Sequence, residues 1–192
     1  MSLSKSKEDN PVEKALKAYL KLLQEKPILT KACTSAVVSS LGNIVSQLIV
    51  PNPQTKGRIA WRSTLAYATF GFCVSGPVFH YFYVNLEKFF PKGSPNAALK
   101  KVLFDRLIFT PPFIFLFLYV VSVLEGQGHA ASMHRIRETY WYILKMNWKV
   151  WTIIQFINIK YIPVKYRVLF GNAVSLIWSV FISYKRRSMV SS

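Results

Sequence analysis

The stretch LIFTPPFIFLFLYVVSVL, residues 107–124, contains no charged side chain and is the clearest hydrophobic segment of the sequence. It is bounded by Asp105 and Arg106 on one side and by Glu125 and Gly126 on the other. A helix needs about 20 consecutive apolar residues to cross a bilayer. The stretch therefore predicts a transmembrane helix and places the chain among integral membrane proteins.

Three further segments have a similar character, at about residues 28–50, 63–88 and 167–184. The first carries a single charged residue, Lys31, and the second is expected to bend at Gly76 and Pro77, because proline interrupts helical hydrogen bonding. Ahead of them, residues 11–26 place apolar side chains on one helical face and lysines elsewhere. This pattern predicts an amphipathic helix that lies either on the lipid surface or on the protein itself.

The composition agrees with a membrane protein. Of the 192 residues, 52% are hydrophobic, 15% are aromatic and only 17% are charged, whereas soluble domains have about 25% charged residues. The net charge of +17 suits either nucleic acid or an anionic membrane surface. Because the aromatic residues lie within the apolar segments, we expect membrane lipid as a partner and no nucleic acid. Cys33 and Cys73 also lie in apolar stretches and are expected to be free, buried thiols.

The stretch NWKVWTIIQFINIKYIP, residues 147–163, is too aromatic for a soluble loop, yet lysine interrupts it too often for a plain span. On a helical wheel, tryptophans and amides share one face, namely Trp148, Trp151, Gln155 and Asn158. Lys149 and Lys160 point elsewhere, so the amides are expected to bond inside the protein while the lysines reach the interface. The stretch predicts a short, partly embedded helix that ends at Pro163, after a surface helix between Gly126 and Lys149.

Together these segments predict an all-α fold, with a single transmembrane helical domain over residues 1–192. It would contain four transmembrane helices, an N-terminal amphipathic helix and the short partly embedded helix before the last span. Four spans place both termini on the same side of the membrane. The distribution of Lys and Arg favours the cytosol for that side, though only by a small excess.

Polar side chains of the first span gather on one helical face, namely Ser35, Ser39 and Ser46, with Asn43 beside them. Such groups can line a watery path, because hydroxyls and amides replace the water around a passing solute. They can equally form a packing seam, because small side chains let helices approach and hydroxyls bond across the contact. The sequence leaves both interpretations open.

His80, Asp105 and Arg167 are ionisable residues within or beside the spans that could take part in function. His80 either faces a cavity or bonds to a neighbouring helix. An ionised carboxylate inside a bilayer is disfavoured by about 3 kcal/mol, so Asp105 is expected to pair with Arg106, a nearby lysine or Arg167. The pair either takes part in solute passage or only fixes the depth of the helix.

No motif in the sequence indicates catalysis. The segment GQGHAA, from Gly126, follows an apolar helix instead of a strand, which excludes a dinucleotide-binding turn. His129 and His134 are five positions apart and do not share a helical face as paired zinc ligands do. We therefore expect no enzyme activity, no cofactor and no metal site.

The spacing W-x-x-W-x-x-x-Q-x-x-N-x-x-x-x-P-x-x-x-R, from Trp148 to Arg167, is highly specific. Further matching positions are Gly71, Gly76, Pro77, Lys101, Asp105, Pro111, Glu125 and Gly126. Together they resemble the 22-kDa peroxisomal membrane protein family, which also has mitochondrial inner-membrane members. The resemblance covers nearly the whole chain. Many members have Trp-Pro and Asp-Gln where this chain has Trp151-Thr152 and Asp105-Arg106, and these departures are similar to the peroxisomal members.

The resemblance implies a multi-pass protein of the peroxisomal membrane with both termini in the cytosol, inserted after synthesis by the peroxisomal membrane-protein import machinery. It also implies a homo-oligomer that forms a weakly selective passive pore for small hydrophilic metabolites. The candidate pore-lining or buried polar residues are Ser35, Ser39, Asn43, Ser46, His80, Asp105, Gln155, Asn158 and Arg167. The alternatives are a structural or assembly protein without a pore, or a mitochondrial inner-membrane relative.

Overall fold

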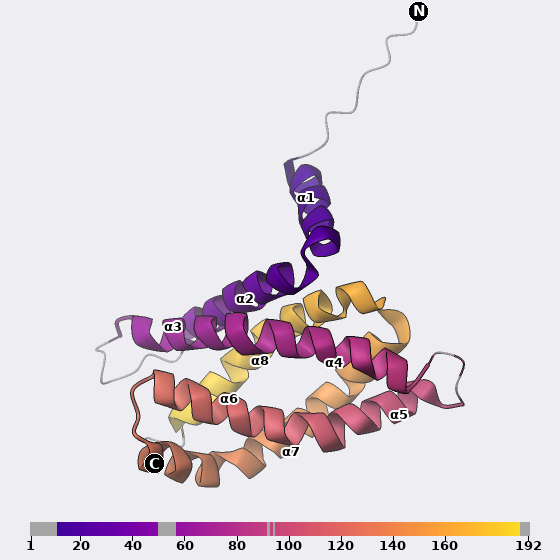
Figure 1. Cartoon of the computed structure of the whole chain (residues 1–192). Helices are drawn as coiled ribbons and strands as arrows, with labels where there is room; N and C mark the ends of the chain where they lie inside the picture. The colour runs from indigo at the N-terminus through magenta and orange to yellow at the C-terminus, as the bar shows by residue number, and fades with distance from the viewer. Residues whose placement is uncertain (1–10, 50–56, 92, 94, 189–192) are drawn as a thin grey trace, which may run out of the picture.

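The computed structural model of the chain describes residues 11–49, 57–91, 93 and 95–188, and every regular element within them is a helix (Figure 1). The helices are α1 (Pro11–Glu25), α2 (Pro27–Ile49), α3 (Trp61–Phe70), α4 (Gly76–Phe89), α5 (Ala97–Phe104), α6 (Thr110–Leu124), α7 (His129–Tyr161) and α8 (Val164–Ser188). The expected all-α class is therefore confirmed. Residue 50, with which the first expected span ends, lies outside the described residues.

α3 and α4 form one continuous helix, and so do α5 and α6, because a π-helical turn joins each pair. These turns are Gly71–Ser75 and Asp105–Phe109. In the first, the N–H of Gly76 donates to the carbonyl of Gly71, five residues back. Each turn is followed two residues later by a proline, which has no N–H to donate and crowds the preceding turn of an α-helix. Next to Gly76 and Pro77, where the sequence predicts a bend, the structure has a wider turn in a helix that continues.

The chain passes along the bundle five times, as α2, α3–α4, α5–α6, α7 and α8 (Figure 1). α7 begins beside the end of α6, where the Tyr119 hydroxyl lies 3.1 Å from His129 Nδ1. α8 begins beside the end of α4, where Arg167 forms an ion pair with Glu87. α2 and α8 consequently run in the same direction. Four expected spans would bring both ends of the chain to one side, whereas these five passes direct α8 away from the end where α2 starts.

α7 corrects the expected division of this region into a surface helix and a short, partly embedded helix. It is one helix of 33 residues, from His129 to Tyr161. The sequence has neither proline nor glycine between Gly128 and Pro163. Both halves also bury one face, since Ile136 and Ile143 pack against α6 while the amides of the second half enter the bundle. Continuous burial along one side stabilises one long helix.

α2 packs closely against α3–α4 at two glycines. A Cβ added to Gly71 would lie 2.7 Å from the carbonyl oxygen of Ser35. A Cβ added to Gly76 would lie 2.7 Å from the backbone nitrogen of Ala32, and closer still to its Cα. Both distances are far below van der Waals contact. This contact is a packing seam of small residues, one of the two arrangements that the polar face of the first span allowed.

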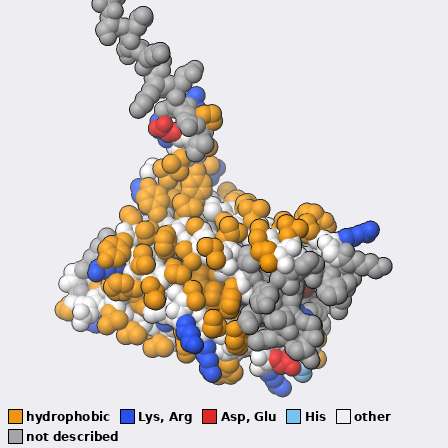
Figure 2. Space-filling model, turned by 180° about the vertical axis from the view of Figure 1, so that it is seen from behind, with side chains coloured by type: hydrophobic (Ala, Val, Ile, Leu, Met, Phe, Trp, Pro, Cys, Tyr) orange, Lys and Arg blue, Asp and Glu red, His pale blue; other side chains and the backbone are white. Residues whose placement is uncertain are grey.

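The outward faces of several helices are apolar. The exposed hydrophobic side chains include Val37, Leu41, Leu48, Leu65, Phe72, Leu107, Ile108, Phe115 and Leu116, from α2, α3–α4 and α5–α6. Figure 2 shows hydrophobic side chains over most of the described part of one side of the molecule. Pro27–Ile49 and Ala97–Leu124 are long and apolar enough to cross a bilayer. Cys33 and Cys73 are free thiols but are exposed, which corrects the expected burial, because both helices turn these positions outward.

Candidate functional site

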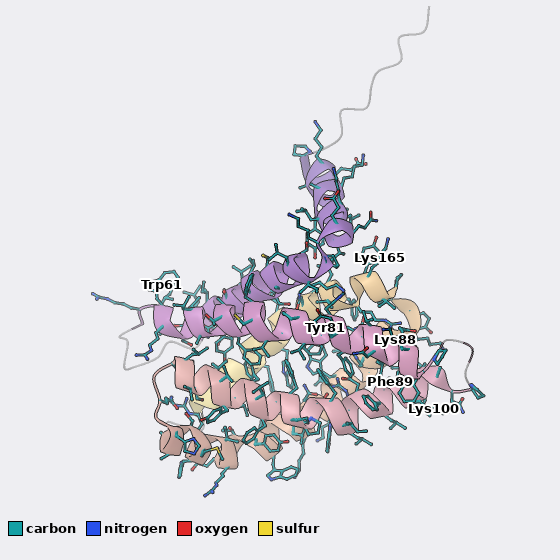
Figure 3. All side chains as sticks on the ribbon, in the orientation of Figure 1. Trp61, Tyr81, Lys88, Phe89, Lys100 and Lys165 are labelled. Atoms are coloured by element: carbon teal, nitrogen blue, oxygen red, sulfur yellow. The ribbon has the colours of Figure 1, made fainter. Side chains whose placement is uncertain are left out.

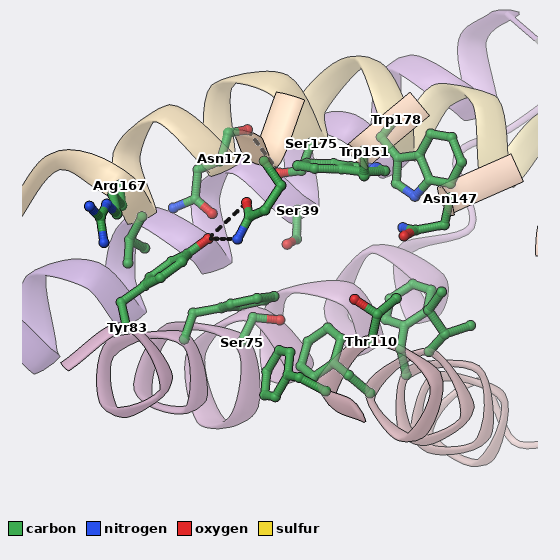
Figure 4. A pocket seen from close by; sticks show the side chains of 18 of the residues that line it. Ser39, Ser75, Tyr83, Thr110, Asn147, Trp151, Arg167, Asn172, Ser175 and Trp178 are labelled. Atoms are coloured by element: carbon green, nitrogen blue, oxygen red, sulfur yellow. Dashed lines mark hydrogen bonds between the residues drawn. The ribbon is translucent and has the colours of Figure 1, made fainter. Parts of the chain in front are cut away.

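A cavity of about 180 Å³ lies inside the bundle, and α2, α3–α4, α5–α6, α7 and α8 all contribute to its wall (Figure 4). One part of the wall is aromatic, formed by Tyr67, Phe79, Phe109, Phe113 and Phe117. Another part is polar, formed mainly by α7 and α8, with Asn147, Trp151, Gln155, Arg167, Asn172 and Ser175. The cavity therefore offers one surface to an apolar body and another to hydrogen-bonding groups.

At one end the wall is formed by Tyr83 and Gln155, and Asn158 of α7 bonds to this pair from behind. The Tyr83 hydroxyl donates to Gln155 Oε1 at 3.4 Å and accepts from Asn158 Nδ2 at 3.2 Å. Asn158 is almost fully buried behind this wall and also donates to the carbonyl of Arg167. These contacts join α4, α7 and α8 at one level of the bundle.

Beyond this level, Glu87 accepts from two buried cations. Lys101 Nζ donates to Glu87 Oε2 at 2.7 Å, and Arg167 Nη1 donates to Glu87 Oε1. Arg167 also donates to the carbonyls of Ile159, at 2.8 Å, and Ile162, at 3.0 Å, which fixes its guanidinium at the start of α8. Glu87, and not Asp105, is therefore the carboxylate that holds Arg167.

A second ion pair borders the middle of the cavity. Asp105 is fully buried and accepts from the neighbouring Arg106, as one of the expected pairings proposed. Arg106 Nη1 donates to Asn147 Oδ1 at 2.9 Å, and Trp148 Nε1 donates to the carbonyl of Arg106 at 2.8 Å. The π-helical turn that begins at Asp105 thus lies against α7 through both side-chain and backbone contacts.

Trp151 differs from Trp148 because its indole N–H is not engaged. The ring lines the cavity and meets the ring of Trp178 edge to face, with centroids 6.2 Å apart (Figure 4). Its Nε1 is buried and has no hydrogen-bond partner among the residues that the structure describes. A buried donor without a partner is unfavourable unless something else accepts its hydrogen.

The structure places only some of the predicted polar residues at this cavity. Ser39, Gln155 and Arg167 line it, and so does Trp151. Ser35 belongs to the seam, where it bonds to Asn172 of α8. Asn158 and Asp105 stand behind the wall.

His80 lies outside the cavity and bonds to a neighbouring helix, the alternative that the sequence left open for it. Lys31 Nζ of α2 donates to His80 Nδ1 at 2.9 Å. Lys31 is buried, so this contact satisfies the one charge carried by the first apolar span. His80 thereby helps to hold α2 against α4.

Asn43 is part of a separate polar cluster at the far end of α2. It accepts from Gln47 Nε2 at 2.6 Å and from Thr64 Oγ1 at 3.0 Å, and donates to Ser63. Gln47 Oε1 in turn accepts from the backbone N–H of Ala60, the residue just before α3. Ser46, one turn from Asn43, is fully buried. This cluster fastens α2 to α3.

Several cavity residues were missed by the sequence reasoning, namely Ser75, Thr110, Asn147, Asn172 and Ser175. Asn147 had a signal, because it precedes Trp151 by four positions and so lies on the helical face already recognised. Asn172 and Ser175 had a weaker one, as two polar residues near each other on the last apolar span. Within the described residues no three His, Cys, Asp or Glu side chains come together as metal ligands.

The apolar outer faces and the buried polar wall define an all-helical membrane protein. A family model described as the Mpv17 / PMP22 family matches residues 122–183. The chain is 44% identical over 173 residues to "Peroxisomal membrane protein 2" of Bos taurus, covering 88% of each protein. The chain therefore belongs to the Mpv17 / PMP22 family.

Other relatives come from two organelles. "Peroxisomal membrane protein PMP22" of Arabidopsis thaliana is 32% identical over 181 residues, which are 93% of each protein. "Mitochondrial inner membrane protein Mpv17" of Xenopus laevis is 30% identical over 169 residues, 88% of this chain and 95% of that protein. These relatives are named as membrane proteins and not as enzymes. No solved structure matches the chain.

Proposed function

We propose that this protein is a passive channel of the peroxisomal membrane for small hydrophilic solutes. The observation that carries the proposal is the cavity, which residues of all five helical passes line and which has polar side chains on otherwise apolar helices. The similarity to "Peroxisomal membrane protein 2" supports the peroxisomal location. Imaging of the tagged full-length protein against both organelles tests the location, and a mitochondrial pattern would refute it.

The exposed aromatic residues of α3–α4 support a position for the bilayer. Trp61 and Tyr81 are exposed and lie about 20 positions, or about 30 Å, apart along one helix. This is the thickness of the hydrocarbon core, and aromatic residues concentrate at its two boundaries. Figure 3 shows Trp61 at one end of the bundle, with Lys88, Lys100 and Lys165 gathered beyond Tyr81 at the other.

The basic end supports an orientation. The bundle end beyond Tyr81 carries these exposed lysines, and the lysine-bearing α1 leaves α2 on the same side, which favours the cytosol for this end. The expectation of two cytosolic termini required an even number of crossings. With five passes we propose a cytosolic amino end and a carboxyl end on the opposite side. Protease protection of tags at each end tests this topology, and equal digestion of both tags would refute it.

The outer face of α7 supports a homo-oligomer. Unlike the apolar outer faces of α2 and α6, it carries exposed Arg137, Glu138 and Lys145. A charged side chain facing lipid near mid-membrane is disfavoured by about 3 kcal/mol. A second copy against this face would remove it from lipid. In a cysteine-free background, Trp141→Cys should cross-link to a second copy and Val37→Cys should not; the reverse would place the interface elsewhere.

Further partners follow from the same proposal. Membrane lipid surrounds the apolar faces, and the peroxisomal membrane-protein import machinery inserts the chain. The basic amphipathic α1 next to the apolar α2 supports an internal address of this kind. Deleting α1 from the tagged protein should reduce its delivery to peroxisomes. Unchanged delivery would move the address to another segment.

Conductance of the purified protein in planar bilayers tests the channel itself. Ser39→Leu places an apolar side chain at the cavity and should reduce conductance, whereas Val37→Leu on the outer face of the same helix should not. Asn43 is unsuitable for this test, because its loss would break the α2–α3 cluster. If no preparation conducts, the protein is a structural or assembly component and the channel proposal fails.

A further inference from the structure

We propose that the central cavity is a binding site for a small monocarboxylate with an apolar or aromatic body. The inference deepens the proposed channel function, since a solute that crosses through the cavity would pass this site. Three independent features of the cavity support it: an unused hydrogen-bond donor, a surplus of positive charge, and a size and shape suited to one small ring.

The unused donor is the indole N–H of Trp151, which is buried without a partner in the described part of the chain. An indole N–H can only donate, so it selects an acceptor such as a carboxylate oxygen. Asn147 lies one helical turn away on the same wall, and its oxygen is already engaged by Arg106. Its amide N–H groups therefore offer further donation to the same ligand.

The charge balance around the cavity favours an anion. Arg106 and Arg167 line the cavity, and Lys101 is connected to Arg167 through Glu87; all three are cations, and each is more than nine-tenths buried. Among the residues that the structure describes, two carboxylates are bonded to them, Asp105 and Glu87. One positive charge is therefore in excess in this buried network, and a buried charge without a counter-charge is unfavourable. A singly charged anion would restore neutrality, whereas an organic cation would double the excess.

The size and the aromatic wall limit the body of the ligand. A cavity of about 180 Å³ is close in size to an engineered apolar cavity of about 150 Å³ that holds benzene. The rings of Phe113 and Phe117 both pack on Phe70 edge to face and present apolar surface to the cavity. Benzoate combines one ring with one carboxylate and is therefore the probe of choice.

The test compares benzoate with benzamide and benzylamine in equilibrium dialysis against the purified full-length protein. Benzoate should bind at least tenfold more tightly than either, because benzamide lacks the charge and benzylamine reverses it. Equal binding of benzoate and benzamide would overturn the proposal. This comparison needs no substitution, so it holds whether or not any variant folds.

Two variants separate the donor from the charge. Trp151→Phe keeps a ring but removes the N–H, and should weaken benzoate binding about tenfold, since bonds to charged groups contribute more than neutral ones. Trp61→Phe, at an exposed ring at the start of α3 and outside the cavity lining, is the matched control and should leave benzoate binding unchanged. Lys101→Met removes the excess positive charge and leaves the ion pair between Glu87 and Arg167 in place. It should therefore reduce the preference for benzoate over benzamide.

The outcomes also separate this site from the channel. Benzoate binding without conductance would refute the channel proposal and support the binding site. Conductance without benzoate binding, or with equal benzoate binding by Trp151→Phe and Trp61→Phe, would refute the site and leave the channel proposal standing.

Discussion

The sharpest test of the fold is Gly76→Ala in the seam between α2 and α4. A Cβ at this position would lie 2.7 Å from the backbone nitrogen of Ala32, and closer to its Cα. Carbon atoms reach contact at about 3.5 Å, so the two helices must separate by about 1 Å. Because the nearest neighbours are backbone atoms of Lys31 and Ala32, no side chain can rotate away to make room.

The expected magnitude follows from two opposing effects. Overpacking of this kind destabilises by about 1–3 kcal/mol, and a clash with backbone belongs at the upper limit. Alanine has a better helix propensity than glycine by about 1 kcal/mol, which offsets part of the loss. The net loss should be about 2 kcal/mol. It should be larger if the separation also lengthens the 2.9 Å bond between Lys31 and His80 beyond hydrogen-bonding distance.

Gly171→Ala is the matched control, because it makes the same chemical change on α8. A Cβ there would meet nothing within 4 Å. The control should gain up to about 1 kcal/mol from helix propensity alone, so the two variants should differ by about 3 kcal/mol. Unfolding by a denaturing detergent, followed by circular dichroism, measures both. Equal stability of Gly76→Ala and Gly171→Ala would refute the close seam.

Two further substitutions test the buried polar network by the same measurement. Glu87→Gln leaves Arg167 and Lys101 without their carboxylate and should destabilise the protein by about 3–5 kcal/mol. Adding Lys101→Met to this variant should recover part of the lost stability. Full stability of the single variant would contradict the ion-pair assignment. Asn158→Leu should lower the free energy of unfolding by about 1–2 kcal/mol, because it removes a buried hydrogen bond to the Tyr83 hydroxyl of α4. Lys160→Gln, at an exposed position, should change it by no more than about 0.5 kcal/mol. A larger effect at Lys160 than at Asn158 would mean that α7 faces the other way.

The helical wheel of the 147–163 stretch predicted one feature of the site correctly, the inward face of amides. Gln155 and Asn158 are buried, and Lys149 and Lys160 are exposed, as the separation of amides from lysines indicated. The signal was strong because polar groups on opposite faces of one helix need different surroundings. The expected boundary near residues 147–149 is wrong, because the charged segment before it and the apolar segment after it indicated two helices, although neither proline nor glycine separates them.

The position of the cavity could not be predicted from the sequence, because neighbouring helices decide which polar residue faces open space. Ser35, Ser39 and Asn43 lie on nearly one line of α2, four positions apart, and the wheel treats them alike. In the structure they have three different neighbours. Ser35 meets α8 near the glycine seam, Ser39 meets the cavity, and Asn43 meets the start of α3.

The polar face of α2 was open to two interpretations, a watery path and a helix-packing seam. In the structure each interpretation applies to a different residue of this one helix. Ser35 and the glycines bring α2, α4 and α8 close enough to form a wall, and a wall is needed before any cavity can be closed from lipid. Ser39, one turn further, lines the cavity that this packing helps to form. A substitution at Ser39 can therefore change solute passage in a folded protein, whereas a substitution at Gly76 should act on stability first and on passage only as a consequence.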